Sequence, residues 1–250
     1  MTDFSYQLYS SRNFGPLPET LKMVGDLGYA QVEGYGGLYA NLSQLDQLKA
    51  DLAANNLAMA TGHFGFDMVS GQADRVLEIA RALDMKGVFV PAPPTPDYRE
   101  GKGDWAAFAA QMAEAGKPYW DAGLEFGYHN HNWEFGGDAE DKPIDLILNA
   151  APGIKLEFDV AWAVRAGQDP WAWIEKYSDK LYAAHLKDLA PEGECPDEDG
   201  WADVGHGTMG WQALFQALKS AGTRLFVMEH DNPSDDRRFA TRSIEAARNF

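Results

Sequence analysis

The 250-residue sequence predicts a parallel (β/α)8 barrel, because short apolar runs alternate with amphipathic stretches from one end to the other. Eight such pairs fit within the usual length of one closed barrel. An open, doubly wound sheet is less favoured, since no G-x-G-x-x-G fingerprint follows any apolar run. No linker or low-complexity stretch divides the chain. We therefore expect residues 1–250 to form one barrel domain.

The expected strands are short and apolar, and a helix with apolar residues three or four positions apart follows each of them. The first helix, for example, carries Leu21, Val24 and Leu27 and ends before Gly28, a residue type that commonly follows a helix end. The strands are 4–10, 29–35, 57–64, 87–90, 124–129, 154–158, 181–185 and 224–229. The helices are 18–27, 41–54, 73–83, 105–122, 144–150, 170–177, 211–221 and 234–249. The longest irregular segment, 188–210, follows the seventh strand, where a barrel places its binding loops.

The composition narrows the possible partners. The chain has 21 basic and 38 acidic residues, a net charge of −17. Such a chain repels phosphate backbones, so we expect neither nucleic acid nor an anionic membrane as a partner. No window approaches the ~20 apolar residues of a membrane span, and we expect a soluble, cytoplasmic protein. Cys195 is the only cysteine, which excludes an internal disulfide. The sequence leaves a homo-oligomer open.

Ionisable residues stand at the ends of four consecutive expected strands. Glu134 follows the fifth strand, Asp159 the sixth, His185 the seventh and Glu229 the eighth. Because the carboxyl ends of barrel strands meet at one mouth, these groups become neighbours. Carboxylates that are forced together repel one another, and a bound cation removes the repulsion. This set of ligands suits one divalent ion: Mn2+, Mg2+, Co2+ or Zn2+.

Other side chains near the same mouth are weaker candidates for substrate binding. His63 ends the third strand, and could equally be a packed core histidine. Lys187 lies two residues after His185 and on the same side of the strand, where it could bind substrate or pair with Asp188. Trp162 could stack on a sugar or pack against the barrel.

One motif carries a resemblance to a known family. Residues 128–135 read Tyr-His-Asn-His-Asn-Trp-Glu-Phe, and His-Leu-Lys-Asp follows at 185–188. With Gln-Leu-Tyr-Ser-Ser-Arg at 7–12, these segments resemble the sugar phosphate isomerase/epimerase family with a xylose isomerase-like TIM barrel, in the subgroup marked by Tyr-His-Asn-His-x-x-Glu-Phe. The resemblance implies a divalent metal held by Glu134, Asp159, His185 and Glu229, with the two glutamates facing each other across the substrate. Many relatives carry the first glutamate inside the fifth strand, so His129 and His131 are alternative groups for metal or substrate.

The predicted function is therefore that of a metal-dependent sugar isomerase or epimerase. Such an enzyme removes a proton next to a carbonyl of a small polyhydroxy substrate and forms an enediolate, with Glu134 and Glu229 as base and acid. A lyase or dehydratase acting on a keto-polyol or keto-glycoside needs the same groups, and a non-catalytic sugar-binding barrel is a further alternative. A nuclease of the AP-endonuclease type is disfavoured by the charge and by the presence of only six histidines. The segment 205–210 lacks the Lys-Ser/Thr of a P-loop, so it does not indicate a phosphorylated substrate.

Overall fold

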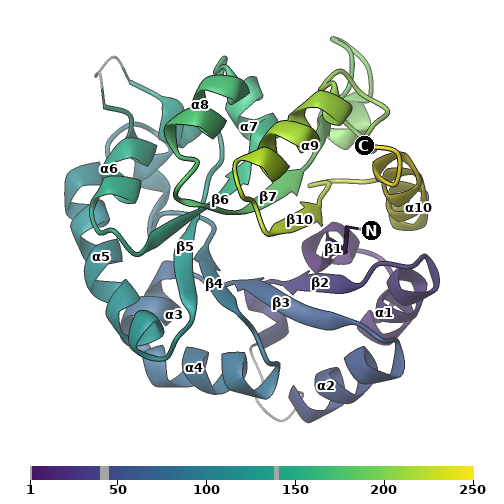
Figure 1. Ribbon diagram of the computed structural model, residues 1–250, viewed down its shortest axis with the longest axis horizontal. Helices are drawn as coiled ribbons and strands as arrows, with labels where there is room; N and C mark the ends of the chain where they lie inside the picture. Colours follow the sequence, from purple (N-terminus) through teal and green to yellow (C-terminus); the bar gives the residue numbers. More distant parts are fainter. Residues whose placement is uncertain (1, 40–44, 138–140) are drawn as a thin grey trace.

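Eight parallel strands close into a barrel in the computed structural model, which describes residues 2–39, 45–137 and 141–250. The order around the barrel is β1-β10-β7-β6-β5-β4-β3-β2 (Figure 1). This confirms the predicted fold class. The strands are β1 Phe4–Gln7, β2 Gln31–Gly34, β3 Ala58–His63, β4 Gly87–Val90, β5 Glu125–His129, β6 Ile154–Asp159, β7 Leu181–Leu186 and β10 Leu225–Met228.

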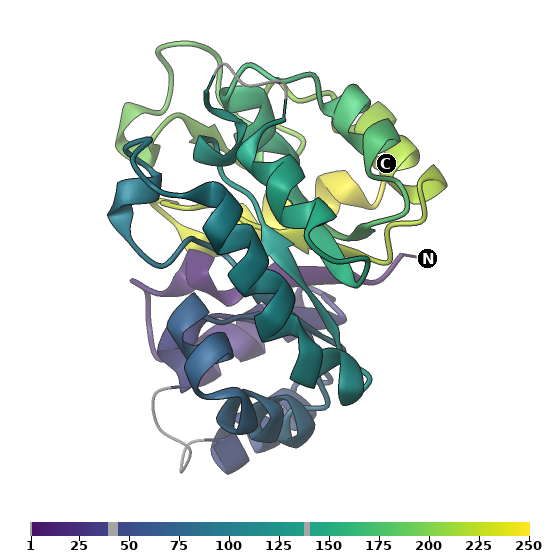
Figure 2. The same cartoon turned by 90° about the vertical axis from the view of Figure 1, so that its left-hand side faces the viewer.

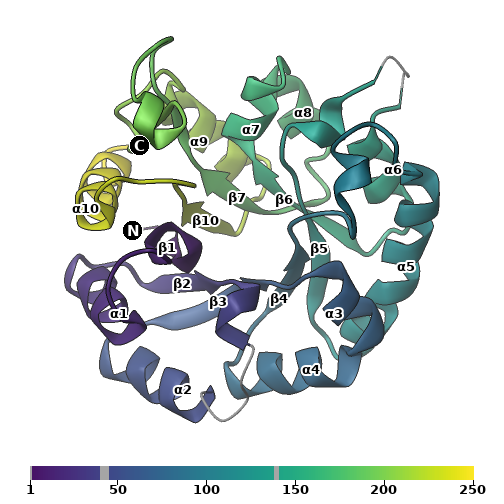
Figure 3. The same cartoon turned by 180° about the vertical axis from the view of Figure 1, so that it is seen from behind.

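Helices surround the strands, as the views from opposite sides show (Figures 1 and 3). Their inward faces are apolar; Phe108 and Met112 of α5, for example, are fully buried against the barrel. Gly28, with φ +86°, ends the first helix as expected. The helices are α1 Leu17–Asp26, α2 Leu45–Ala54, α3 Phe66–Gly71, α4 Ala73–Ala82, α5 Trp105–Asp121, α6 Pro143–Asn149, α7 Val160–Arg165, α8 Pro170–Lys176, α9 Trp211–Ser220 and α10 Asp236–Ala247. The expected helix 41–54 begins in residues 41–44, which lie outside the described residues.

Three local features differ from the expected pattern. The first strand ends at Gln7 and not at residue 10, because Leu8–Ser11 form a 3-10 helix whose first turn is capped by the Gln7 side chain. Two short helices, α3 and α7, directly follow β3 and β6. The side chain of Asp159 caps α7, because its Oδ1 accepts a hydrogen bond from Trp162 N. The second carboxylate oxygen of Asp159, Oδ2, takes no part in this cap.

The segment 188–210 contains a small antiparallel ladder. In it, β8 (Asp188–Leu189) pairs with β9 (Trp201–Ala202). In the side view, green loops of this part of the chain extend beyond the barrel (Figure 2). No helix within the described residues is long and apolar enough to cross a membrane.

Candidate metal centre and active site

The strand register brings ionisable side chains of neighbouring strands together. His129 of β5 pairs with Glu157 of β6, and Asp159 of β6 pairs with His185 of β7. Glu33 of β2 lies in register with Thr61 of β3. Side chains two residues apart on a strand point to the same side, so Glu157 and Asp159 both point into the barrel. The barrel interior is therefore charged near its carboxyl end.

One group of these side chains has the geometry of a metal site. His129, Asp159, His185 and Glu229 each offer a ligand atom, and these atoms lie within 4.8 Å of one another. We call this group the outer set. All four side chains are buried. Asp159 Oδ2 is fully enclosed and accepts no hydrogen bond, and the ammonium group of Lys187 lies 3.0 Å from it. A divalent cation held by the four ligand atoms would be a second positive partner for this oxygen.

Lys187 lies beside the outer set and is completely buried. Its Nζ is 3.0 Å from Asp159 Oδ2, 2.9 Å from Glu229 Oε2 and 3.0 Å from Asp231 Oδ2. Burial alone would lower the pKa of Lys187, but these carboxylates outweigh burial and raise it. Lys187 is therefore a fixed positive charge. Lys187 is enclosed and does not line the cavity described below, so it contacts the carboxylates from the side away from the cavity.

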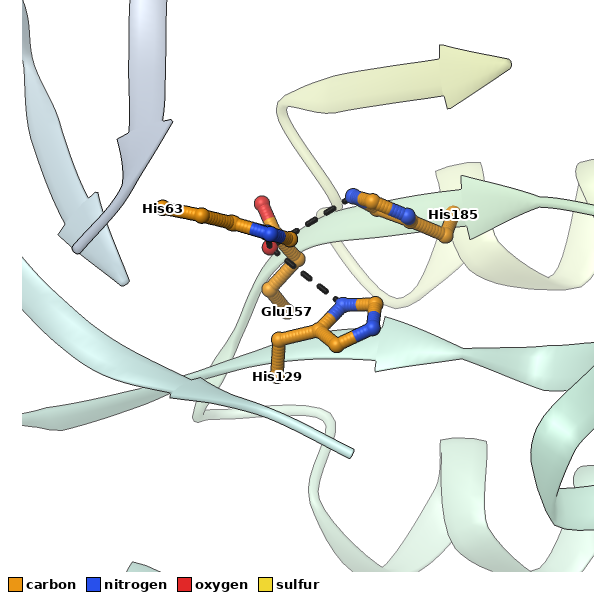
Figure 4. A group of neighbouring side chains, drawn as sticks. All are labelled: His63, His129, Glu157 and His185. Atoms are coloured by element: carbon orange, nitrogen blue, oxygen red, sulfur yellow. Dashed lines mark hydrogen bonds and ion pairs between the residues drawn. The ribbon is translucent and has the colours of Figure 1, made fainter. Parts of the chain in front are cut away.

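A second group, the inner set, lies deeper in the barrel and shares two histidines with the outer set. It consists of His63, His129, Glu157 and His185 (Figure 4). His63 Nε2 is 2.5 Å from Glu157 Oε2, and His129 Nδ1 is 3.4 Å from the same oxygen. Both ring nitrogens of His185 contact a carboxylate. Its Nδ1 is 2.8 Å from Glu229 Oε2, and its Nε2 is 2.8 Å from Glu33 Oε1.

Burial and the neighbouring charges shift the pKa values of several of these groups. Burial raises the pKa of Glu33. Burial and the neighbouring His185 and His63 lower the pKa of His129 to about 4. Burial also disfavours an ionised Glu157, but His185 and His63 reverse the effect and hold its pKa below the usual range. Burial lowers the pKa values of His63 and His185, but the neighbouring glutamates outweigh burial and raise both. The five carboxylates of the two sets with Glu33 and Asp231 still outnumber Lys187 and these two histidines. The donor set and its excess of negative charge thus fit a divalent cation.

Glu134 is not brought together with the other expected ligands. It lies in a short 3-10 helix, Trp133–Phe135, and is fully buried. Tyr128 donates its hydroxyl to Glu134 Oε1 at 2.6 Å, and His131 N donates to Oε2 at 2.8 Å. Burial raises the pKa of Glu134 to about 7. The structure thus places His129 where the sequence suggested Glu134, while Asp159, His185 and Glu229 do come together.

A cavity of about 640 Å³ opens above the outer set. Five of the residues expected from the sequence line it: His63, His129, His131, Trp162 and Glu229. His131 stacks on Trp133, with ring centroids 4.3 Å apart, and its buried Nδ1 has no hydrogen-bond partner. Asp199 and Trp201 also line the cavity, as expected for the segment 188–210.

Sequence reasoning missed three acidic residues of this region. Glu33, Glu157 and Asp231 were not singled out, although all contact the histidines or Lys187. For Glu157 a signal was present, because a glutamate two residues before Asp159 on the same strand must share its side. Glu33 is the only charged residue of the expected strand 29–35, which is an equally readable signal.

Known proteins are similar to this chain in sequence or in fold. An inosose dehydratase from Clostridium botulinum is 27% identical over 97 residues, which are 38% of this chain and 32% of that protein; the match thus spans about a third of the relative. The structure of a sugar phosphate isomerase/epimerase from Parabacteroides distasonis aligns with a TM-score of 0.79 at 20% identity, covering 98% of this chain and 94% of that one. A 3-keto-D-glucoside 4-epimerase from E. coli aligns with a TM-score of 0.73 at 16% identity, over 100% of both chains. The family model described as a xylose isomerase-like TIM barrel matches residues 21–250, and the chain therefore belongs to this family.

Proposed function

We propose that the protein is a divalent-metal-dependent isomerase or epimerase acting on a sugar or keto-sugar through an enediolate. The observation that carries this proposal is the outer set, in which buried carboxylates and imidazoles converge at the floor of a cavity of substrate size. His129, Asp159, His185 and Glu229 would hold the ion. When bound there, a divalent ion would polarise a carbonyl and stabilise the negative charge of the enediolate.

The chain supplies groups that can move the proton. Glu229 and His131 both line the cavity. Burial raises the pKa of Glu229, but Lys187 and His185 outweigh it and hold the carboxyl ionised. Burial lowers the pKa of His131, which keeps its imidazole neutral but makes it a weaker base, so proton removal would depend on the metal ion to acidify the substrate. We keep Glu229 in the acid–base role and assign His131 beside it in place of Glu134, which does not line the cavity.

Metal content of the purified protein tests the ligand set. We expect about one divalent ion per chain after loading with Mn2+, Co2+ or Zn2+. His129→Ala and His185→Ala should lose it, and so should Asp159→Asn, which retains the Oδ1 cap of α7. Glu134→Gln should keep the ion, because this carboxylate is bound to Tyr128 and His131 instead. Loss of metal in Glu134→Gln with retention in His129→Ala would restore the set expected from the sequence. A wild-type protein that takes up no ion would contradict the proposal.

The reaction itself is tested by proton exchange. Incubation of the metal-loaded protein with ketoses and keto-glycosides in deuterated water should introduce deuterium next to the carbonyl, as detected by NMR. His131→Gln should slow this exchange while leaving the metal bound, since His131 is no member of the outer set.

A dehydratase is the second candidate, because the Clostridium botulinum relative bears that name. Both reactions begin with removal of a proton next to a carbonyl, and they differ in whether a hydroxyl group then leaves. Mass spectrometry of the same incubations distinguishes the two: deuterium uptake without loss of water indicates an isomerase or epimerase, and loss of one water indicates a dehydratase.

A further inference from the structure

Two arginines flank a wall of tryptophans in the cavity. Arg99 precedes α5, and its guanidinium lies 4.4 Å from the ring centre of Trp133. Arg165 ends α7 and lies 3.4 Å from the ring centre of Trp201. Trp162 connects the two, with ring centroids 6.3 Å from Trp133 and 4.7 Å from Trp201. Both arginines and all three tryptophans line the cavity. Flat stacking on an aromatic ring holds a guanidinium in place and leaves its N–H edge available.

Neither arginine has a carboxylate partner within the part of the chain that the structure describes, although the chain carries 38 acidic residues. By contrast, Arg238 and Arg242 on α10 form ion pairs with Glu198 or Asp203. Arg165 donates one hydrogen bond to the carbonyl oxygen of Asp199, which is a neutral acceptor. Burial lowers the pKa of Arg165 more than the nearby carboxylates of Asp231, Asp159 and Asp199 raise it, although Arg165 forms no ion pair with any of these three.

Arg12 faces the same cavity from the β1 side. It lies over the ring of Tyr9 at 3.7 Å and donates to the carbonyl oxygens of Tyr9 and Asp231. Within the described residues it also forms no ion pair with a side-chain carboxylate. The cavity thus has an acidic floor, formed by Glu229 and Asp231, and cationic groups on its walls. A neutral sugar would not require these cations, and the floor would repel a substrate with an anion at its reacting end.

We propose that the substrate carries an anionic substituent, a carboxylate or a phosphate, that is bound at the tryptophan wall flanked by Arg99 and Arg165 while its carbonyl end reaches the outer set. The inference rests on the proposed function for the position of the reacting end. The anion itself is recognised by charge-assisted hydrogen bonds from a stacked guanidinium group, whose paired N–H donors match two oxygens of a carboxylate or of a phosphate. The substrate class is then a sugar acid or a sugar phosphate.

Calorimetric titration with three compounds that share a carbon skeleton tests this proposal: D-fructose, D-fructuronate and D-fructose 6-phosphate. At low salt we expect at least one anionic compound to bind about tenfold or more tightly than D-fructose, as one or two charge-assisted hydrogen bonds allow. At least one of Arg99→Gln and Arg165→Gln should remove most of this difference. Arg237→Gln is the matched control, because Arg237 is exposed on α10 and does not line the cavity. The compound that binds more tightly identifies carboxylate or phosphate.

Equal binding of the neutral and anionic compounds, no binding of either anion, or an anion preference that survives both cavity substitutions would overturn the proposal. Titrations of the protein with and without Mn2+ test the anion site independently of the proposed metal-dependent reaction. If the anion preference persists in a protein that takes up no metal, the anion site stands and the metal-dependent reaction fails. If metal binds and deuterium exchange occurs without an anion preference, the reaction stands and the anion site fails.

Discussion

At the level of single residues, the histidines of the outer set are each backed by a carboxylate. Glu33 Oε1 lies 2.8 Å from His185 Nε2, on the ring side opposite Glu229. Glu157 Oε2 lies on the Nδ1 side of His129, at 3.4 Å and without a hydrogen bond between them. A carboxylate behind a ligating imidazole fixes which nitrogen carries the proton and makes the other nitrogen a stronger donor. Glu33 is therefore expected to act through His185.

Replacing Glu33 with Gln should weaken metal binding about 10- to 100-fold, the usual effect of removing such a partner. The amide has the same size, so it can still hydrogen-bond to Gln7 and Thr61, which donate to the Glu33 carboxylate in the wild type. Titration of Mn2+ into the metal-free variant, with a competing chelator, measures the affinity. Glu134→Gln is the control, because it neutralises another fully buried carboxyl group outside both sets. An equal loss of affinity in the two variants would show a general effect of removing buried charge.

At the level of elements, an ion-pair network fastens the segment 188–210 to α10. Arg238 donates to both oxygens of Glu198, at 2.9 and 3.0 Å, and to Asp203. Glu198 also accepts hydrogen bonds from Ser234, at the approach to α10. Between these two acidic residues lies Trp201, which packs against Trp162 on the cavity wall. The network therefore positions one wall of the candidate active site.

Arg238→Ala should lower the free energy of unfolding by about 1–3 kcal/mol, because it leaves two largely buried carboxylates with fewer partners. Hydrogen exchange of residues 196–204 should rise more than that of the barrel strands, since the loss is local. Arg237→Ala, one position earlier on the exposed face of α10, should change neither quantity. Unchanged exchange in Arg238→Ala would mean that the loop is held by its aromatic packing alone.

The regular elements could be predicted because each repeats an apolar pattern over enough residues to be recognised. The helices α3 and α7 have six residues each, and β8 and β9 have two, so no period develops in them. Their position also depends on tertiary partners. The capping of α7 by Asp159, for instance, requires a strand to end at that residue.

The candidate site was less accessible to sequence reasoning than the fold. Asp159, His185 and Glu229 could be grouped because they end strands, and parallel strands end at one mouth. Glu134 could not be separated from His129 in this way, because both stand near the end of β5 and only the 3-10 turn decides which one faces the other strands. The stacking of Arg165 on Trp201 joins positions 36 residues apart in a non-repeating segment, for which the sequence has no pattern.

For the molecule as a whole, buried histidines determine how acid affects stability. His230 is fully buried, its Nδ1 accepts a hydrogen bond from Asn232 N, and its ring packs against Phe239. Burial lowers its pKa to about 4. The unfolded chain, with a histidine pKa of about 6.5, therefore binds a proton that the folded chain does not bind between these values. The contribution of His230 to stability is complete above about pH 6.5 and decreases as the pH falls towards 4.

Urea unfolding of the chelator-treated protein between about pH 7 and pH 4.5 should show this loss. The shift of His230 corresponds to about 3 kcal/mol across its full range, so the pH dependence should be visibly steeper in the wild type than in His230→Asn. The asparagine oxygen can replace Nδ1 as the acceptor for Asn232 N. His206→Asn removes an exposed histidine and should keep the wild-type slope.

Acid also reduces the charge of −17, and with it the self-repulsion, to a similar extent in all three proteins, so only the difference between their slopes reports on His230. Parallel slopes in the wild type and His230→Asn would mean that the buried ring becomes protonated without cost, and acid stability would then depend on the carboxylates and histidines of the two sets in the barrel.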